Sequence, residues 1–189
     1  MTMKFVFDER KAAQAAAHLL HRHDGPMPYI KLIKLLYLAD RRAFVETGHP
    51  VTGDRLVSMN NGPVLSTILD LIRQTGGLGR SVWHEYVSDP DARFTVTATC
   101  PAELDAVDDE LSEYERDLLD AIFLEFGGAN EWDLVDYTHT LPEWIDPQGS
   151  SVAIDPKTIL KSEGFTKKEV AAVESEVTAF HDLHTRYLA

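Results

Sequence analysis

One segment near the N-terminus is apolar on almost every side when it is drawn as an α-helix. Residues 29–42 read YIKLIKLLYLADRR, and apolar side chains spread well beyond a single stripe. One face carries Tyr29, Leu32, Ile33, Leu36 and Ala43, and Ile30, Leu35 and Leu38 lie outside that face. A surface helix has one apolar stripe, so this breadth predicts a central helix packed by several neighbours. Pro28 at the first turn, and Gly48 as C-cap after Thr47, predict its ends.

Three cations interrupt the apolar surface of this helix. Lys31, Lys34 and Arg41 are spaced by three and seven residues, so they form a narrow strip along one side. Long basic side chains are mostly exposed in proteins, which favours a solvated edge. The alternative is that the helix pairs these cations inside the protein.

The remaining sequence predicts an α+β fold that is predominantly α-helical, with one β-hairpin. Helices are expected over residues 8–23, 112–127, 130–141, 155–164 and 166–189, with the caps Asp8, Ser112, Asn130, Asp155 and Thr166. A further helix is expected to open at Gly62-Pro63 and to end at Gly76-Gly77. Residues 55–59 are expected to be extended, residues 82–87 and 93–98 to pair as the hairpin, and residues 101–110 to form an acidic connector.

This order of elements is similar to a winged helix in the N-terminal half. The helix at Gly62-Pro63 would then be the recognition helix, and the ribbon over residues 82–98 the wing. A DNA-binding regulator is therefore an alternative function. The cations on these elements are few, namely Arg73, Arg80 and Arg93, and the formal net charge of the chain is −13. Because affinity for nucleic acid depends on a cationic surface, the charge argues against a nucleic-acid partner and favours a cationic protein partner.

Composition places the chain among compact intracellular proteins. Its 189 residues are 44% hydrophobic, which suffices for one core. No apolar run approaches the roughly 18 residues of a membrane span, and the first seven residues predict no signal peptide. The single cysteine, Cys100, fits a reducing compartment, so a cytoplasmic location is expected. The sequence predicts no oligomeric state.

Catalytic and metal-binding patterns are weak in this sequence. His18 with His21, and His181 with His184, lie one helical turn apart, but neither pair has a neighbouring cysteine or the acidic partner of a zinc motif. No nucleophile elbow is present, and Cys100 has no local base. We therefore expect no enzyme activity, no cofactor and no metal, and a metal-dependent hydrolase is only a minor alternative.

The segment 139–144 combines an imidazole, a proline and an indole where a helix must break. The simplest interpretation is structural: the Trp144 ring covers the helix end, and His139 binds a free backbone carbonyl. Asn61-Gly62-Pro63 is likewise most simply a turn followed by a helix start.

These elements resemble, in their order and spacing, the Panacea domain, also called the SocA-like antitoxin domain. The resemblance depends on the helix from Lys31 to Ala39, on Gly62-Pro63-Val64, on the helix with an acidic cap, and on Thr138, His139 and Trp144. It assigns residues 1–148 to the domain and residues 149–189 to a C-terminal helical extension packed on it. The positions that it singles out are Lys31, Lys34, Tyr37, Gly62, Pro63, Val64, His139 and Trp144.

The resemblance implies a non-catalytic antitoxin from a bacterial or phage toxin–antitoxin operon. Such a protein neutralises a cognate toxin by stoichiometric binding, and the handing of the antitoxin to a protease system stays open. Partner specificity varies widely in the family, so the toxin is not identified. If the ribbon over residues 82–98 has an apolar outer face, Trp83, Tyr86 and Phe94 are candidate anchors for the partner; otherwise they line the core.

Overall fold

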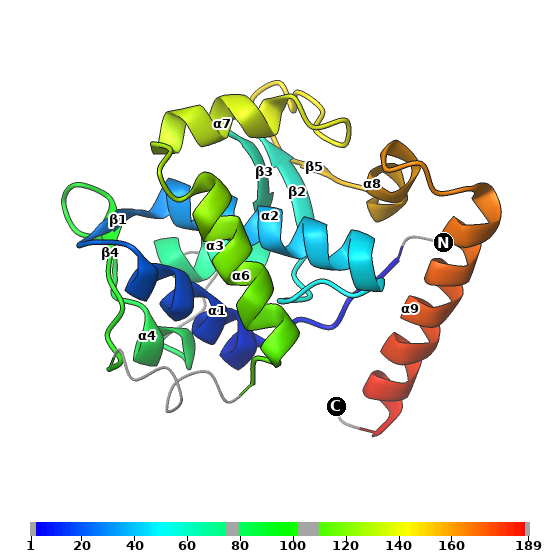
Figure 1. Cartoon of the computed structure of the whole chain (residues 1–189), viewed down its shortest axis with the longest axis horizontal. Coiled ribbons are helices and arrows are strands. Elements are labelled where there is room, and N and C mark those ends of the chain that lie inside the picture. Colours follow the sequence, from blue (N-terminus) through cyan, green and yellow to red (C-terminus); the bar gives the residue numbers. More distant parts are fainter. Residues whose placement is uncertain (1–2, 75–79, 102–109, 188–189) are drawn as a thin grey trace.

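The structure is a computed structural model that describes residues 3–74, 80–101 and 110–187. The elements are α1 (Glu9–Arg22), β1 (Met27–Pro28), α2 (Tyr29–Thr47), β2 (Leu56–Met59), β3 (Gly62–Leu65), α3 (Ser66–Arg73), α4 (Trp83–Tyr86), β4 (Thr95–Val96), α6 (Glu113–Phe126), α7 (Glu131–His139), β5 (Val152–Ala153), α8 (Pro156–Ser162) and α9 (Lys167–Tyr187). Figure 1 shows the arrangement. The predominantly helical α+β class predicted from the sequence is confirmed. The expected turn at Gly76-Gly77 and most of the acidic connector lie outside the described residues.

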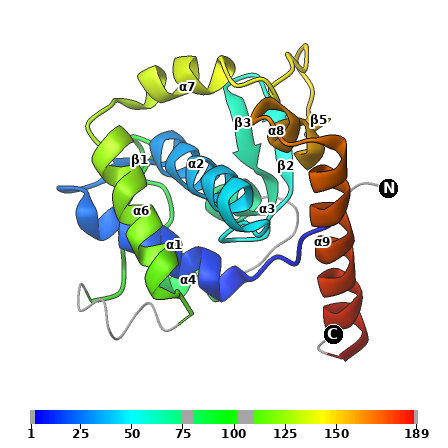
Figure 2. The same ribbon diagram turned by 45° about the vertical axis from the view of Figure 1, so that its right-hand side comes forward.

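Helix α2 is the centre of the molecule, as its all-round apolar pattern predicted. It contacts α1, α6, α7, α8 and the strand β3, and twelve of its residues are buried. Both views show α6 crossing it on one side and α7 lying over the β2–β3 strands (Figures 1 and 2). The helix ends at Thr47, where Gly48 adopts a left-handed conformation with φ +80°. Both ends of the helix were therefore predicted correctly.

Local capping signals also placed the other long helices correctly. The side chain of Asp8 accepts a hydrogen bond from the N–H of Lys11 at the start of α1. Ser112 and Asn130 form complete capping boxes at α6 and α7. Thr166 exchanges hydrogen bonds with Glu169 at the start of α9 in the same way.

The expected helix start at Gly62-Pro63 is wrong. Residues 62–65 form strand β3, which pairs antiparallel with β2 around the turn at Asn60-Asn61. Proline is tolerated there because β3 is an edge strand in the order β3-β2-β5. Helix α3 begins later, at Ser66, where the carboxylate of Asp54 accepts the N–H groups of Thr67 and Ile68 at 3.1 and 2.8 Å. The cap comes from more than ten residues upstream, so no local signal marks it.

The expected hairpin over residues 82–98 is also wrong. Residues 83–86 form the short helix α4, and β4 pairs with β1 instead, with only the bridge between Val87 and Ala98 joining the two segments. The carboxylate of Glu9 accepts the N–H of Trp83 at 2.8 Å, which satisfies a free donor at the start of α4. Among the residues that the structure describes, the winged-helix order is therefore not found.

The C-terminal segment packs on the domain through β5, α8 and the first half of α9. Strand β5 pairs with β2, and Ile154, Ile159 and Leu160 are buried in the core. Helix α9 then runs along one side of the molecule, where the N-terminal segment also runs (Figures 1 and 2). The division at residue 148 stays a prediction. Among the described residues, no helix has both the length and the hydropathy needed to span a membrane.

Candidate functional site

Residues from four parts of the chain meet at the turn between β2 and β3. We call Lys34, Gly62, Pro63, Thr138, His139 and Trp144 the signature cluster. The ammonium of Lys34 on α2 donates to the carbonyl of Pro63 at 2.8 Å. Gly62 has φ +89°, and a Cβ atom there would lie 2.7 Å from Lys34 Nζ and 2.7 Å from Thr138 Oγ1. Glycine is therefore required both by its backbone conformation and by the close approach of two side chains.

His139 and Trp144 hold the same turn from the other side. Nε2 of His139 lies 3.1 Å from the carbonyl oxygen of Asn60, and Nε1 of Trp144 donates to the carbonyl of Met59 at 3.1 Å. The two rings contact each other at an interplanar angle of 35°, with centroids 4.2 Å apart. The expectation that His139 binds a free carbonyl identified the type of contact, but the carbonyls belong to the hairpin and not to the broken end of α7.

The cationic strip on α2 is buried, so the expected solvated edge is wrong for both lysines. Lys34 is 1% exposed, and burial lowers the pKa of its ammonium to about 7. Lys31 is 5% exposed and donates to the carbonyl of Gly127 at 2.6 Å, just beyond the end of α6. A cation is favoured there because the last carbonyls of a helix carry partial negative charge. Desolvation by burial lowers the pKa of Lys31 as well.

Tyr37 and Arg41 share the buried carboxylate of Glu143. The hydroxyl of Tyr37 donates to Glu143 at 2.8 Å, and Nε of Arg41 donates to the same oxygen at 2.7 Å. Burial, followed by the charge of Glu143, raises the pKa of Tyr37 well above its usual value. Arg41 also pairs with Glu163 at 2.8 Å, just after α8. This network connects the central helix to the segment after α7 and to the C-terminal tail.

Trp83 and Tyr86, the candidate anchors, lie on α4 inside the protein. Trp83 is 1% exposed and Tyr86 is 9% exposed, so they line the core, which is the alternative left open by the sequence. The outer ribbon face on which the anchor hypothesis depended does not exist. Phe94 differs, since it is 66% exposed.

Most of the sequence-predicted site residues are therefore buried, whereas His139 and Trp144 are half-buried. Lys34, Gly62, Pro63, His139 and Trp144 come together at the hairpin, with Val64 buried beside them, whereas Lys31 and Tyr37 act at separate places along α2. Sequence reasoning gave no role to Glu143, although it lies in the segment 139–144, and it named Thr138 only as part of the family resemblance. Their burial next to a cation or a glycine depends on distant contacts and gives no local signal.

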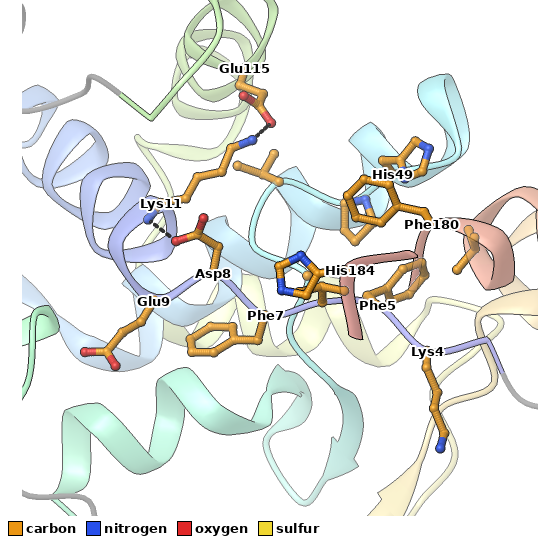
Figure 3. Close-up of a pocket in the computed structure, with 15 residues that line it drawn as sticks. Lys4, Phe5, Phe7, Asp8, Glu9, Lys11, His49, Glu115, Phe180 and His184 are labelled. Carbon is orange, nitrogen blue, oxygen red and sulfur yellow. Dashed lines mark hydrogen bonds and ion pairs between the residues drawn. The ribbon is translucent and has the colours of Figure 1, made fainter. Parts of the chain in front are cut away.

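A groove lies between the N-terminal segment and α9, and we call it the α9 groove (Figure 3). It measures about 540 Å³ and is lined by residues 4–9, Lys11, residues 49–51, Gly53, Glu115, Val177, Phe180 and His184. Val170, Val173 and Val177 pack against the domain, and Phe180, His184 and Tyr187 continue the same helical stripe. Phe180 is 52% exposed and Tyr187 is 70% exposed, so this stripe extends beyond what the domain covers.

Charged groups surround the apolar part of the groove. Lys11 bridges to Glu115 at 2.6 Å, and Asp8 and Glu9 lie on the same wall (Figure 3). On α9, Glu176 and Asp182 have side chains that are 69% exposed, and Glu176 lies 3.6 Å from Nε2 of His49. The groove thus combines an apolar part with charges of both signs, because Lys4 and Lys11 line it together with three carboxylates. The chain as a whole has a net charge of −13, which favours a partner segment with both apolar and basic side chains.

The histidine pairs are engaged in other contacts. Nε2 of His18 lies 2.6 Å from a carboxylate oxygen of Asp120, and His21 lies 3.6 Å from the sulfur of Cys100. Across residues 3–74, 80–101 and 110–187, no three histidine, cysteine or acidic side chains gather as metal ligands would. The geometry therefore offers no support for the hydrolase alternative.

Comparison with known proteins gives one match. A family model described as "Antitoxin SocA-like, Panacea domain" matches residues 32–145, which span the chain from α2 to the segment after Trp144. No curated protein matches the chain, and no solved structure does.

Proposed function

Because the chain belongs to the family of SocA-like antitoxins with a Panacea domain, we propose that it neutralises a cognate protein toxin by direct, stoichiometric and non-catalytic binding. Membership of an antitoxin family implies a toxin as partner in general terms. The mode of neutralisation, the cytoplasmic location and the cationic character of the toxin are parts of the proposal.

The inward orientation of the signature cluster is the observation that carries this proposal. Lys34, Gly62 and Thr138 are buried and contact one another or the hairpin backbone, and His139 and Trp144 bind backbone carbonyls. These groups stabilise a scaffold, and no reacting group is left free among them. This arrangement is compatible with a protein that binds its partner through its outer surface.

The α9 groove is the surface that best suits the toxin. It is apolar along Val177 and Phe180, and it lies in a chain of net charge −13. We expect a toxin segment with apolar side chains to enter it and basic side chains to face the surrounding carboxylates. Desolvated aromatic anchors would set the dissociation rate, and the charges would increase the association rate.

Neutralisation is tested by co-expressing the chain with the product of the adjacent open reading frame, in cells that this product alone poisons. We expect growth to be rescued and the two proteins to co-purify as a stable complex. Rescue without a complex would instead indicate repression or degradation. The proposal is overturned if the product of the adjacent reading frame is toxic, but the chain neither restores growth nor binds that product.

The groove is tested by Phe180→Glu, which places a charge in the apolar part of the groove. Leu124→Glu is the matched control, because Leu124 is 88% exposed on α6 and does not line the groove. We expect the first variant to lose rescue and complex formation and the second to keep both, with equal urea stability of the two variants. Rescue by Phe180→Glu at the level of the unchanged chain would refute the groove as the interface, and neutralisation would then use another face.

A further inference from the structure

A second cavity lies beside the hairpin of β2 and β3, and we call it the hairpin pocket. It measures about 290 Å³, close to the lower end of the range for small-molecule sites. Four segments line it: residues 29, 30, 33 and 34 of α2, residues 59–61 and 64 of the hairpin, Leu69 and Arg73 of α3, and residues 149 and 150. The antitoxin function proposed above does not use this pocket.

The charge of the hairpin pocket is opposite to that of the molecule. The chain has 31 acidic and 18 basic residues, yet the lining contains Lys34 and Arg73 and no carboxylate. Within the part of the chain that the structure describes, neither of these two cations forms an ion pair. Such a local reversal of charge attracts anions, because nothing in the wall neutralises the cations.

Contacts with Tyr29 fix the orientation of the Arg73 side chain. Its guanidinium lies 5.5 Å from the centroid of the Tyr29 ring, and Nη2 donates to the Tyr29 hydroxyl at 3.1 Å. This stacking fixes one face of the guanidinium and leaves other N–H donors for a bidentate contact with an oxyanion. Arg73 itself is exposed, so a ligand can reach it.

Lys34 supplies a further donor from inside the wall, and it is a second cation when its amine is protonated. It is 1% exposed, and its recorded hydrogen bond goes to the carbonyl of Pro63. An ammonium has three donors, and a buried charge without a counter-charge is costly. The lowered pKa of Lys34, about 7 and caused by burial, agrees with the missing counter-charge. A bound anion nearby would supply the negative charge that the protein does not place beside Lys34.

The rest of the lining adds apolar and neutral polar groups. Ile30, Ile33, Val64 and Leu69 form apolar walls, and the exposed turn residues Asn60 and Asn61 contribute carboxamides. Next to the pocket, Phe94 packs edge-on against Tyr29 with centroids 6.4 Å apart. Phe94 has φ +61°, which is rare for a bulky residue, and such strain is commonly kept where it serves a function.

We propose that the hairpin pocket binds a small organic anion, one that carries a carboxylate or phosphate next to an apolar or aromatic body. Arg73 would bind the anionic group with Lys34 behind it, and the walls around Ile33 and Tyr29 would take the apolar body. Two different anionic groups share this chemistry, so the test contains an arm for each.

The test uses the purified full chain and two probes, adenosine monophosphate for phosphate and N-acetylphenylalanine for carboxylate. Adenosine and N-acetylphenylalanine amide are the matched neutral controls. Titration calorimetry at probe concentrations up to about 10 mM should show saturable binding of at least one anionic probe. Its neutral counterpart should bind about tenfold more weakly or worse, as expected for the loss of a charge-assisted contact.

Arg73→Gln shows whether the binding occurs in this pocket. We expect Arg73→Gln to lower the affinity for the bound probe by about tenfold or more. Arg186→Gln, at an exposed position of α9, should leave this affinity unchanged. The class of probe that binds identifies the anionic group. The proposal is overturned if neither anionic probe binds, if the neutral analogue binds equally well, or if Arg73→Gln has no effect.

Discussion

Replacement of Gly62 by alanine should destabilise the protein by two separable effects. The first is backbone strain, because φ is +89° and a left-handed conformation costs an alanine about 1–2 kcal/mol. The second is a clash, because the new Cβ would lie 2.7 Å from both Lys34 Nζ and Thr138 Oγ1. If Lys34 moves away, it loses its bond to Pro63 inside the protein, which costs about 1–3 kcal/mol. The expected total is about 2–5 kcal/mol.

Gly164→Ala is the matched control for the first effect. Gly164 has φ +88°, almost the same as Gly62, but a Cβ there would meet nothing within 4 Å. We expect this variant to lose only the backbone part, about 1–2 kcal/mol. Urea denaturation of the unchanged chain and both variants gives the free energies of unfolding. Their difference isolates the contact with the signature cluster.

A third variant tests whether the Lys34 side chain causes the clash with an alanine at position 62. In a Lys34→Ala background the Nζ atom is absent, so Gly62→Ala should cost less there than in the unchanged chain, with a coupling of about 1 kcal/mol. The reasoning is refuted if Gly62→Ala and Gly164→Ala differ by less than about 0.5 kcal/mol, a difference no larger than ordinary additivity errors.

Three further predictions concern the buried groups. Burial lowers the pKa of Lys34 from 10.5 to about 7 in the folded protein, so between these values the unfolded chain binds the extra proton and the free energy of unfolding rises with pH. Measured against Lys34→Met, the unchanged chain should gain about 2 kcal/mol of stability between about pH 7 and pH 9, and an equal pH slope in both proteins would contradict this. Glu143→Ala should cost about 3–5 kcal/mol in urea denaturation, because it leaves Arg41 without its buried partner, whereas loss of the more exposed Glu163 should cost at most about 1 kcal/mol. Trp83→Ala should cost about 3–5 kcal/mol, whereas Trp83→Phe should still rescue cells from the toxin; failure of a stably folded Trp83→Phe would restore Trp83 as a contact residue.

Helix ends were predictable because their causes are local. The hydrogen bonds of Asp8, Ser112 and Asn130 reach only two or three residues along the chain, so the sequence contains both partners. The left-handed Gly48 is likewise visible as a glycine after an apolar run. Hence the central helix and most of its neighbours follow from the sequence without knowledge of tertiary contacts.

Strand β3 and helix α4 were not predictable because distant groups decide them. Gly62-Pro63 has the composition of a helix start, but pairing with β2 and the remote cap from Asp54 delay the helix to Ser66. Residues 82–86 alternate like a strand, but burial of Trp83 and the carboxylate of Glu9 favour a helical turn. In each case a tertiary contact outweighs a local preference of comparable size.

The sequence predicted which residues belong to the candidate site, but not that their side chains point into the protein. The sequence singled out Lys34, Gly62, His139 and Trp144, and the structure brings them to one turn. It could not indicate that Lys34 is buried, because the spacing of a lysine on a helix is the same whether it faces solvent or a carbonyl. The acceptor, Pro63, lies twenty-nine residues away and becomes a neighbour only through the fold.

The inward orientation of the signature cluster has a consequence for how relatives of this protein diverge. Residues that support one another inside the hairpin tolerate change only in concert, so Gly62 and Lys34 should be inherited as a unit. Beyond Val177, helix α9 is not constrained in this way by buried contacts, because Phe180 and Tyr187 are exposed. Substitutions in the exposed part of α9 should therefore affect the stability of the fold much less than substitutions in the signature cluster.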